Sequence, residues 1–283
     1  MKNQITTILL LGVMSCALVA FGSMFGPGFA GIALILALGM NFFGYFYSDR
    51  FVLRYNHARE ASPVEDPGLH RMVEELATAA GLPKPKVYII DEHAPNAFAT
   101  GRNAEHGAVA VTTGLRRMLS ERELRGVLAH EMAHIKNRDI LLATLAACIA
   151  SAVMHMASMA RFSAMFGSSQ QDDDEGGLSM VGTILMSLLA PVAIMMVQMG
   201  ISRSREYLAD ATGARLSGDP AALASALQKI HHGAEMETGN FEPATASLFI
   251  ANPFLGSRGS WMNLLSTHPD MNERIRRLNA MTL

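Results

Sequence analysis

The chain has 283 residues, of which 50% are hydrophobic and 17% are charged, and its formal net charge is −2. Soluble globular domains usually carry about 25% charged residues, so this composition predicts extensive burial in protein or in lipid. The charge supplies no basic excess for neutralising phosphates, and we expect no nucleic-acid partner. Both cysteines, Cys16 and Cys148, lie in apolar segments, which predicts no disulfide framework.

Four segments of at least 20 residues contain no Asp, Glu, Lys or Arg: 5–25, 29–48, 140–160 and 178–200. A helix of 20 residues spans the roughly 30 Å hydrocarbon core of a bilayer. Buried core helices are the alternative, and they are a stronger alternative for the last two segments, which contain polar groups such as Gln198. We predict four membrane spans, with two transmembrane helices in 1–48 and an inserted transmembrane hairpin in 140–200.

The distribution of Lys and Arg predicts the orientation of these spans. The loop between the third and fourth spans has one Arg and four acidic residues. Basic residues gather on the opposite side, at Lys2, Arg50, Arg54, Arg59, Lys136, Arg138, Arg203 and Arg205. We therefore expect both termini and the soluble segments to face the cytoplasm.

The first soluble segment, 49–139, predicts helices and a small sheet. Residues 66–80 have Pro67 in the first turn and Gly81 after the last one, which is typical of a helix. Short β-rich stretches follow at 84–90, 96–101 and 107–115, the last two at hairpin spacing. Ser120 and Glu123 then form a capping-box pattern at the start of another helix.

The second soluble segment, 201–283, predicts three helices. The first ends at Gly218, the second runs from Asp219 to Gly233, and a short third one follows Pro269. Together, 49–139 and 201–283 predict a mostly helical α+β domain with a small β-sheet. The membrane hairpin interrupts this domain.

The helix that begins at Ser120 contains the sequence HEMAH at 130–134. Residues four apart lie on one helix face, so His130 and His134 can bind a single ion. Glu131 follows the first histidine and would project beside the ion, where it can deprotonate a zinc-bound water. The pattern is typical of a zincin-like metalloprotease, which needs one more protein ligand.

Candidates for the third ligand lie downstream of the membrane hairpin. A metzincin would have a histidine at position 140, which is Ile140 here. Glu206 and Asp210 share one helix face, so one carboxylate could bind zinc while the other orients a histidine. Glu235 and Glu237 are weaker alternatives because they follow Gly233, the predicted helix end.

HEMAH, followed after a long interval by SREYLADATGA, resembles the membrane-embedded zinc metallopeptidases of family M48, and within them the bacterial heat-shock membrane proteases. The segments PNAFATGR at 95–102, AVAVTTGLR at 108–116 and STHP at 266–269 extend the resemblance over essentially the whole chain. The resemblance implies one zinc ion per chain on His130, His134 and Glu206, with Glu131 as the base. It also implies endoproteolysis of damaged or misassembled membrane proteins at the bacterial inner membrane.

Two further residues are candidates for contacts with substrate. His268 resembles a family histidine near the active site and could contact the tetrahedral oxyanion, while Asn96 could hold substrate backbone through its amide. The stretch 108–113 could be an edge strand that pairs with an extended substrate. Unfolded polypeptides, membrane proteins and the bilayer are the expected partners, and self-association of chains is a further candidate.

Two other functions fit part of the pattern. A membrane scaffold with a structural zinc site is one, but such sites usually have four protein ligands, often cysteines. A peptidase of prenylated peptides is the other, and it shares the zinc chemistry and the resemblance to family M48.

Overall fold

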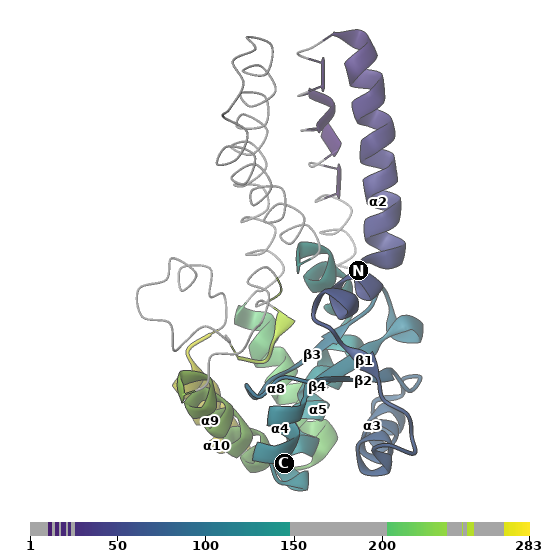
Figure 1. Ribbon diagram of the computed structural model, residues 1–283. Helices are drawn as coiled ribbons and strands as arrows, with labels where there is room; N and C mark the ends of the chain where they lie inside the picture. Colours follow the sequence, from purple (N-terminus) through teal and green to yellow (C-terminus); the bar gives the residue numbers. More distant parts are fainter. Residues whose placement is uncertain are drawn as a thin grey trace, which may run out of the picture.

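The computed structural model describes residues 26–147, 203–236 and 269–283, together with the shorter stretches 11–12, 15–16, 18–20, 22–23, 245 and 248–251 (Figure 1). Most of the first predicted span, the inserted hairpin beyond residue 147 and His268 lie outside the described residues.

Helix α2 (Pro27–Tyr55) projects away from the sheet and from the helices labelled around it (Figure 1). Pro27 occupies its first turn, and apolar residues follow without a polar face. It is long and apolar enough to cross a membrane, with a mean hydropathy of 1.8 over its most apolar stretch. Large side chains such as Ile35 and Phe43 are exposed, which distinguishes α2 from the core helix of a soluble domain. The helix includes the second predicted span and continues to Tyr55.

The sheet has four strands in the order β1-β2-β4-β3. They are β1 (Arg59–Glu60), β2 (Lys86–Ile90), β3 (Ala97–Thr100) and β4 (Ala108–Thr112). The predicted hairpin pairing is present, because β3 and β4 are antiparallel with Phe98 opposite Ala110. β2 pairs with the other side of β4 in parallel, with Val87 opposite Val109.

The position of β4 corrects one expectation. Residues 108–112 form a central strand with partners on both sides, and a helix begins at Thr113, so the stretch 108–113 cannot pair with a substrate as an edge strand. Its five residues are buried, as expected of a strand in the middle of a covered sheet. The edge strands of the sheet are β1 and β3.

Helix α3 (Pro67–Ala80) has the predicted boundaries. The Asp66 side chain accepts a hydrogen bond from the Leu69 N–H, and Gly81 ends the helix with a φ of 68°. The short helix α4 (Thr113–Met118) replaces the end of the predicted third β stretch. Here the Thr112 hydroxyl accepts a hydrogen bond from the Leu115 N–H, so a helix cap ends the strand.

Helix α5 (Glu121–Lys136) begins with the predicted capping box between Ser120 and Glu123. The Glu123 carboxylate also accepts hydrogen bonds from Ser225 and Lys229, which lie in helix α9 (Pro220–Met236). Burial raises the pKa of Glu123, but these partners and Ser120 outweigh burial and lower it to about 2. The carboxylate therefore fixes the start of α5 against α9.

Helices α8 (Arg203–Ser217) and α9 (Pro220–Met236) pack against α5, and α10 (Met271–Asn279) packs against α8 and α9. Asp219 accepts a hydrogen bond from the Ala222 N–H, as a residue before a helix does. The predicted end of α9 at Gly233 is wrong, because the helix continues to Met236. A side chain at position 233 would lie 2.6 Å from Met118 and 2.7 Å from Pro95, so this glycine serves close packing inside the helix.

Helix α5 is the centre of the domain. It contacts α3, α8, α9 and the edge strand β3, and the side chains of Val127, Leu128 and Met132 are fully buried. Burial of this much apolar surface fixes the position of α5, and with it the position of every functional group on its inner face.

Candidate metal centre

The two histidines of α5 converge on one point. His130 is fully buried, and its Nε2 atom lies 3.2 Å from Nε2 of His134. The two rings are almost perpendicular, at 88°. Two nitrogens bound to one tetrahedral zinc at about 2.0–2.1 Å would lie roughly 3.3 Å apart. The pair therefore has the spacing that a shared ion requires.

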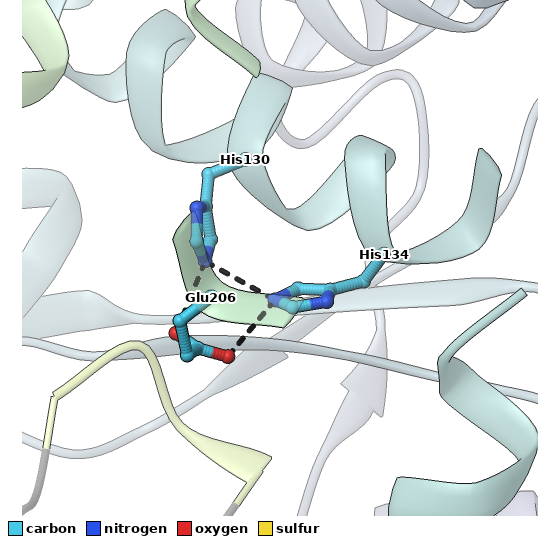
Figure 2. Close-up of side chains that lie close together, drawn as sticks. All are labelled: His130, His134 and Glu206. Carbon is cyan, nitrogen blue, oxygen red and sulfur yellow. Dashed lines mark hydrogen bonds and ion pairs between the residues drawn. The ribbon is translucent and has the colours of Figure 1, made fainter. Parts of the chain in front are cut away.

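Glu206 reaches the same point from α8, as Figure 2 shows. Its Oε1 atom lies 3.5 Å from Nε2 of His134, and its Oε2 atom lies 3.8 Å from Nε2 of His130. The ligand atoms of these three residues all lie within 4.8 Å of one another. The structure thus brings together three of the predicted ligands, and their donor set, two imidazoles and a carboxylate, suits zinc.

Asp210 lies one turn after Glu206 on α8 and approaches the outer nitrogen of His130. The distance from Asp210 Oδ1 to His130 Nδ1 is 2.9 Å, although the contact lacks the alignment of a regular hydrogen bond. This is the position from which a carboxylate fixes the tautomer of a ligand histidine and leaves its Nε2 lone pair free for an ion. Glu206 and Asp210 therefore occupy the two different places that the sequence left open.

Arg274 of α10 completes this group, and sequence reasoning missed it. Its Nε and one terminal nitrogen donate hydrogen bonds of 2.8 and 2.7 Å to the two oxygens of Asp210. Its Nη1 atom lies 3.5 Å from Oε2 of Glu206. Burial alone raises the pKa of Asp210, but Arg274 and His130 lower it to about 2, so the carboxylate is ionised.

A sequence signal for Arg274 does exist. Met271, Arg274 and Leu278 are spaced by three and four residues, so the arginine lies on the buried face of an otherwise polar helix. A charged residue on the apolar face of a helix predicts a buried partner. The side chain of Arg274 has no exposed surface at all.

Glu131 lies beside the three candidate ligands and is only 1% exposed. The backbone N–H of Ala99, in the edge strand β3, lies near its carboxylate and lowers its pKa slightly. Burial raises the pKa of Glu131 above its ordinary value, while His130 and His134 oppose that effect. A carboxylate with a raised pKa accepts a proton more readily, as a general base requires.

The surroundings of His134 favour a cation. Burial lowers the pKa of His134, but Asp139, with Oδ2 at 3.4 Å from Nδ1, and Glu206 raise it to about 9. Binding of a metal ion at Nε2 must therefore displace a proton. The acidic groups that hold this proton would favour a divalent ion in the same way.

Asn96 is buried at the start of β3 and contacts another part of the chain. Its Nδ2 atom donates a 3.0 Å hydrogen bond to the Ala251 carbonyl, and its Oδ1 atom accepts from the Ala97 N–H. The Ile250 N–H donates to the Ala97 carbonyl, so residues 248–251 lie along part of the open edge of β3. A contact between Asn96 and substrate stays a prediction, as does the role of His268.

The region of the chain that matches a known protein family includes the residues of this site. Residues 63–282 match the model of Peptidase family M48, a range that includes the two histidines, Glu131, Glu206 and Arg274. The chain belongs to peptidase family M48. This confirms the enzyme class inferred from the motif, a zinc metalloendopeptidase.

Relatives of this M48 peptidase cover nearly its full length. It is 51% identical over 280 residues to a protease HtpX homolog of Desulforapulum autotrophicum, which covers 98% of this chain and 90% of the relative. It is 50% identical over 286 residues to a protease HtpX homolog of Paraburkholderia phytofirmans, which covers 99% and 98%.

A solved structure shows the same fold. The crystal structure of Ste24p from S. mikatae matches with a TM-score of 0.53 at 20% sequence identity, over 98% of this chain and 67% of that one. The fold expected from the sequence, a mostly helical α+β domain with a small sheet, is confirmed.

Proposed function

We propose that this M48 peptidase binds one zinc ion per chain through His130, His134 and Glu206 and hydrolyses peptide bonds of unfolded or misassembled membrane proteins. The observation that supports it most directly is the convergence of three ligand atoms from two helices within 4.8 Å of one another, with a buried carboxylate beside them. A bound zinc ion would act as a Lewis acid and lower the pKa of a water molecule.

In this mechanism the side chain of Glu131 transfers the proton. Glu131 takes a proton from the attacking water at its carboxylate, and the water oxygen forms a bond to the peptide carbonyl carbon. The same carboxyl group then gives the proton to the leaving nitrogen as the C–N bond breaks. Asp210 and Arg274 hold His130 in place during both steps, and His268 is our candidate for contacting the oxyanion.

The membrane setting of the proposed function rests on the helices. Helix α2 is long, apolar and exposed, and the Lys and Arg residues flank the predicted spans on one side. We place the enzyme in the bacterial inner membrane as a multi-pass protein, with its active site and both termini in the cytoplasm. In that setting, membrane proteins that fail to fold are the nearest substrates.

The test is an assay of the full chain in detergent. The protein is purified with a chelator, zinc is added, and cleavage of an unfolded membrane protein is followed for the wild type, Glu131→Gln and Glu121→Gln. Glu121 is exposed in the first turn of the same helix, so its substitution is the matched control.

Loss of a general base reduces the rate by about 10²–10⁴-fold, so Glu131→Gln should show almost no cleavage while Glu121→Gln matches the wild type. Equal rates in all three proteins would exclude the proposed mechanism.

A further inference from the structure

The backbones of helices α5 and α8 lie close together at Gly213. A Cβ atom at this position would lie 2.8 Å from both Cα and N of His130 and 3.0 Å from the carbonyl carbon of Ala129. These are backbone atoms of a buried helix, which cannot rotate away as the end of a side chain can. By helix propensity alone, alanine would be favoured over glycine here, so packing accounts for the glycine.

The same face of α8 carries the carboxylates of the site. Gly213 follows Asp210 by three residues and Glu206 by seven, and these spacings place all three on one side of the helix. The distance between the α8 and α5 backbones at Gly213 therefore sets how far Glu206 and Asp210 lie from the two histidines.

We infer that Gly213 is a positioning residue of the metal centre, because it holds the helix of Glu206 at the distance at which one ion contacts both helices. The inference rests on the proposed metal site. An added methyl group would lie 2.8 Å from the His130 backbone and needs about 0.6 Å more to reach an ordinary contact of 3.4 Å. Metal–ligand bonds tolerate only about 0.2 Å. Glu206 can rotate to recover part of this distance, but Asp210 is held by two hydrogen bonds from Arg274.

A second glycine provides a matched control. A Cβ atom at Gly126 of α5 would lie 3.0 Å from N and 3.1 Å from Cα of Leu223, again backbone atoms of a neighbouring helix. Helix α9, which carries Leu223, supplies none of the three candidate ligands. Gly126→Ala therefore adds a milder steric strain of the same kind to the domain, without separating the two helices that carry the candidate ligands.

The experiment measures zinc affinity by competition with a chromophoric chelator, and thermal unfolding of the metal-free protein, on full-length chains in detergent. The chains are wild type, Gly213→Ala, Gly126→Ala and Glu206→Ala. We expect Gly213→Ala to weaken zinc binding by about 10–100-fold, the range seen when groups that orient metal ligands are changed. Gly126→Ala should lower the unfolding temperature and keep the wild-type zinc affinity.

Cadmium gives a second, geometric readout. Its bonds to nitrogen and oxygen are longer than those of zinc, so a widened site should lose less cadmium affinity than zinc affinity. If Gly213 had a purely structural role, the ratio of cadmium affinity to zinc affinity would be the same in Gly213→Ala as in the wild type.

Wild-type zinc affinity in Gly213→Ala, equal losses in the two glycine variants, or a Gly213→Ala chain that fails to fold would each overturn the inference. Equal zinc binding by wild type and Glu206→Ala would instead refute the proposed metal site.

Discussion

Replacement of Arg274 by methionine tests the buried ion pair behind the metal centre. The guanidinium is fully buried and binds both oxygens of Asp210, which is 4% exposed. Methionine has a similar length but no charge, so it leaves an ionised carboxylate buried without its cation. Removing one partner of a buried ion pair typically costs about 3–5 kcal/mol of unfolding free energy. Most of that cost reflects the uncompensated charge, and not the net contribution of the pair.

Urea unfolding of the metal-free full chain in detergent, followed by circular dichroism, measures this cost. Arg276→Met is the control on the same helix, because Arg276 pairs with Glu273 at the surface and its side chain is 77% exposed. We expect less than about 1 kcal/mol for that surface pair. The double variant Arg274→Met with Asp210→Asn should lose at least about 1 kcal/mol less than the sum of the single losses, because the buried negative charge is gone. Strictly additive losses would refute the ion-pair account.

Two further predictions concern residues outside the candidate metal site. Glu123→Gln should flatten the pH dependence of stability. The pKa of the wild-type carboxylate is lowered from 4.5 to about 2, so it contributes stability that is present above pH 4.5 and is lost as the pH falls to 2. This contribution is at most about 3 kcal/mol. Urea midpoints that fall equally in both proteins between pH 6 and pH 3 would contradict this prediction. Asn96→Ala should lower the unfolding free energy by about 1–3 kcal/mol, because it removes the buried amide that binds the Ala251 carbonyl. Unchanged stability with a reduced kcat/KM would assign Asn96 to substrate binding.

Local signals in the sequence predicted much of the fold. Pro67 in the first turn of α3, the capping box of Ser120 and the start of α9 after Asp219 all act between near neighbours, and the structure contains each of them. The central position of β4 could not be predicted in this way, because it depends on β2, which pairs with it in parallel from about 20 residues upstream. Gly233 misled for a similar reason: Met118 and Pro95, not a helix cap, account for it.

The residues of the candidate site also differ in whether local sequence spacing or tertiary packing reveals them. His130, Glu131 and His134 were found because their spacing on one helix is itself the signal. The sequence indicated Glu206 and Asp210 only as a pair. Their separate roles depend on their three-dimensional positions, because Glu206 follows His134 by 72 residues and Asp210 follows His130 by 80. Arg274 reaches the site through the tertiary packing of α10. The spacing of apolar residues in α10 indicates that Arg274 is buried, but it does not show which residues it contacts.

Equilibrium zinc binding by the wild type, Glu131→Gln and Glu206→Ala tests the central claim most directly. Our account predicts one zinc ion per chain for the wild type, near-wild-type affinity for Glu131→Gln, whose carboxylate acts on water, and strongly reduced affinity for Glu206→Ala. Wild-type affinity in Glu206→Ala would contradict the metal centre described here.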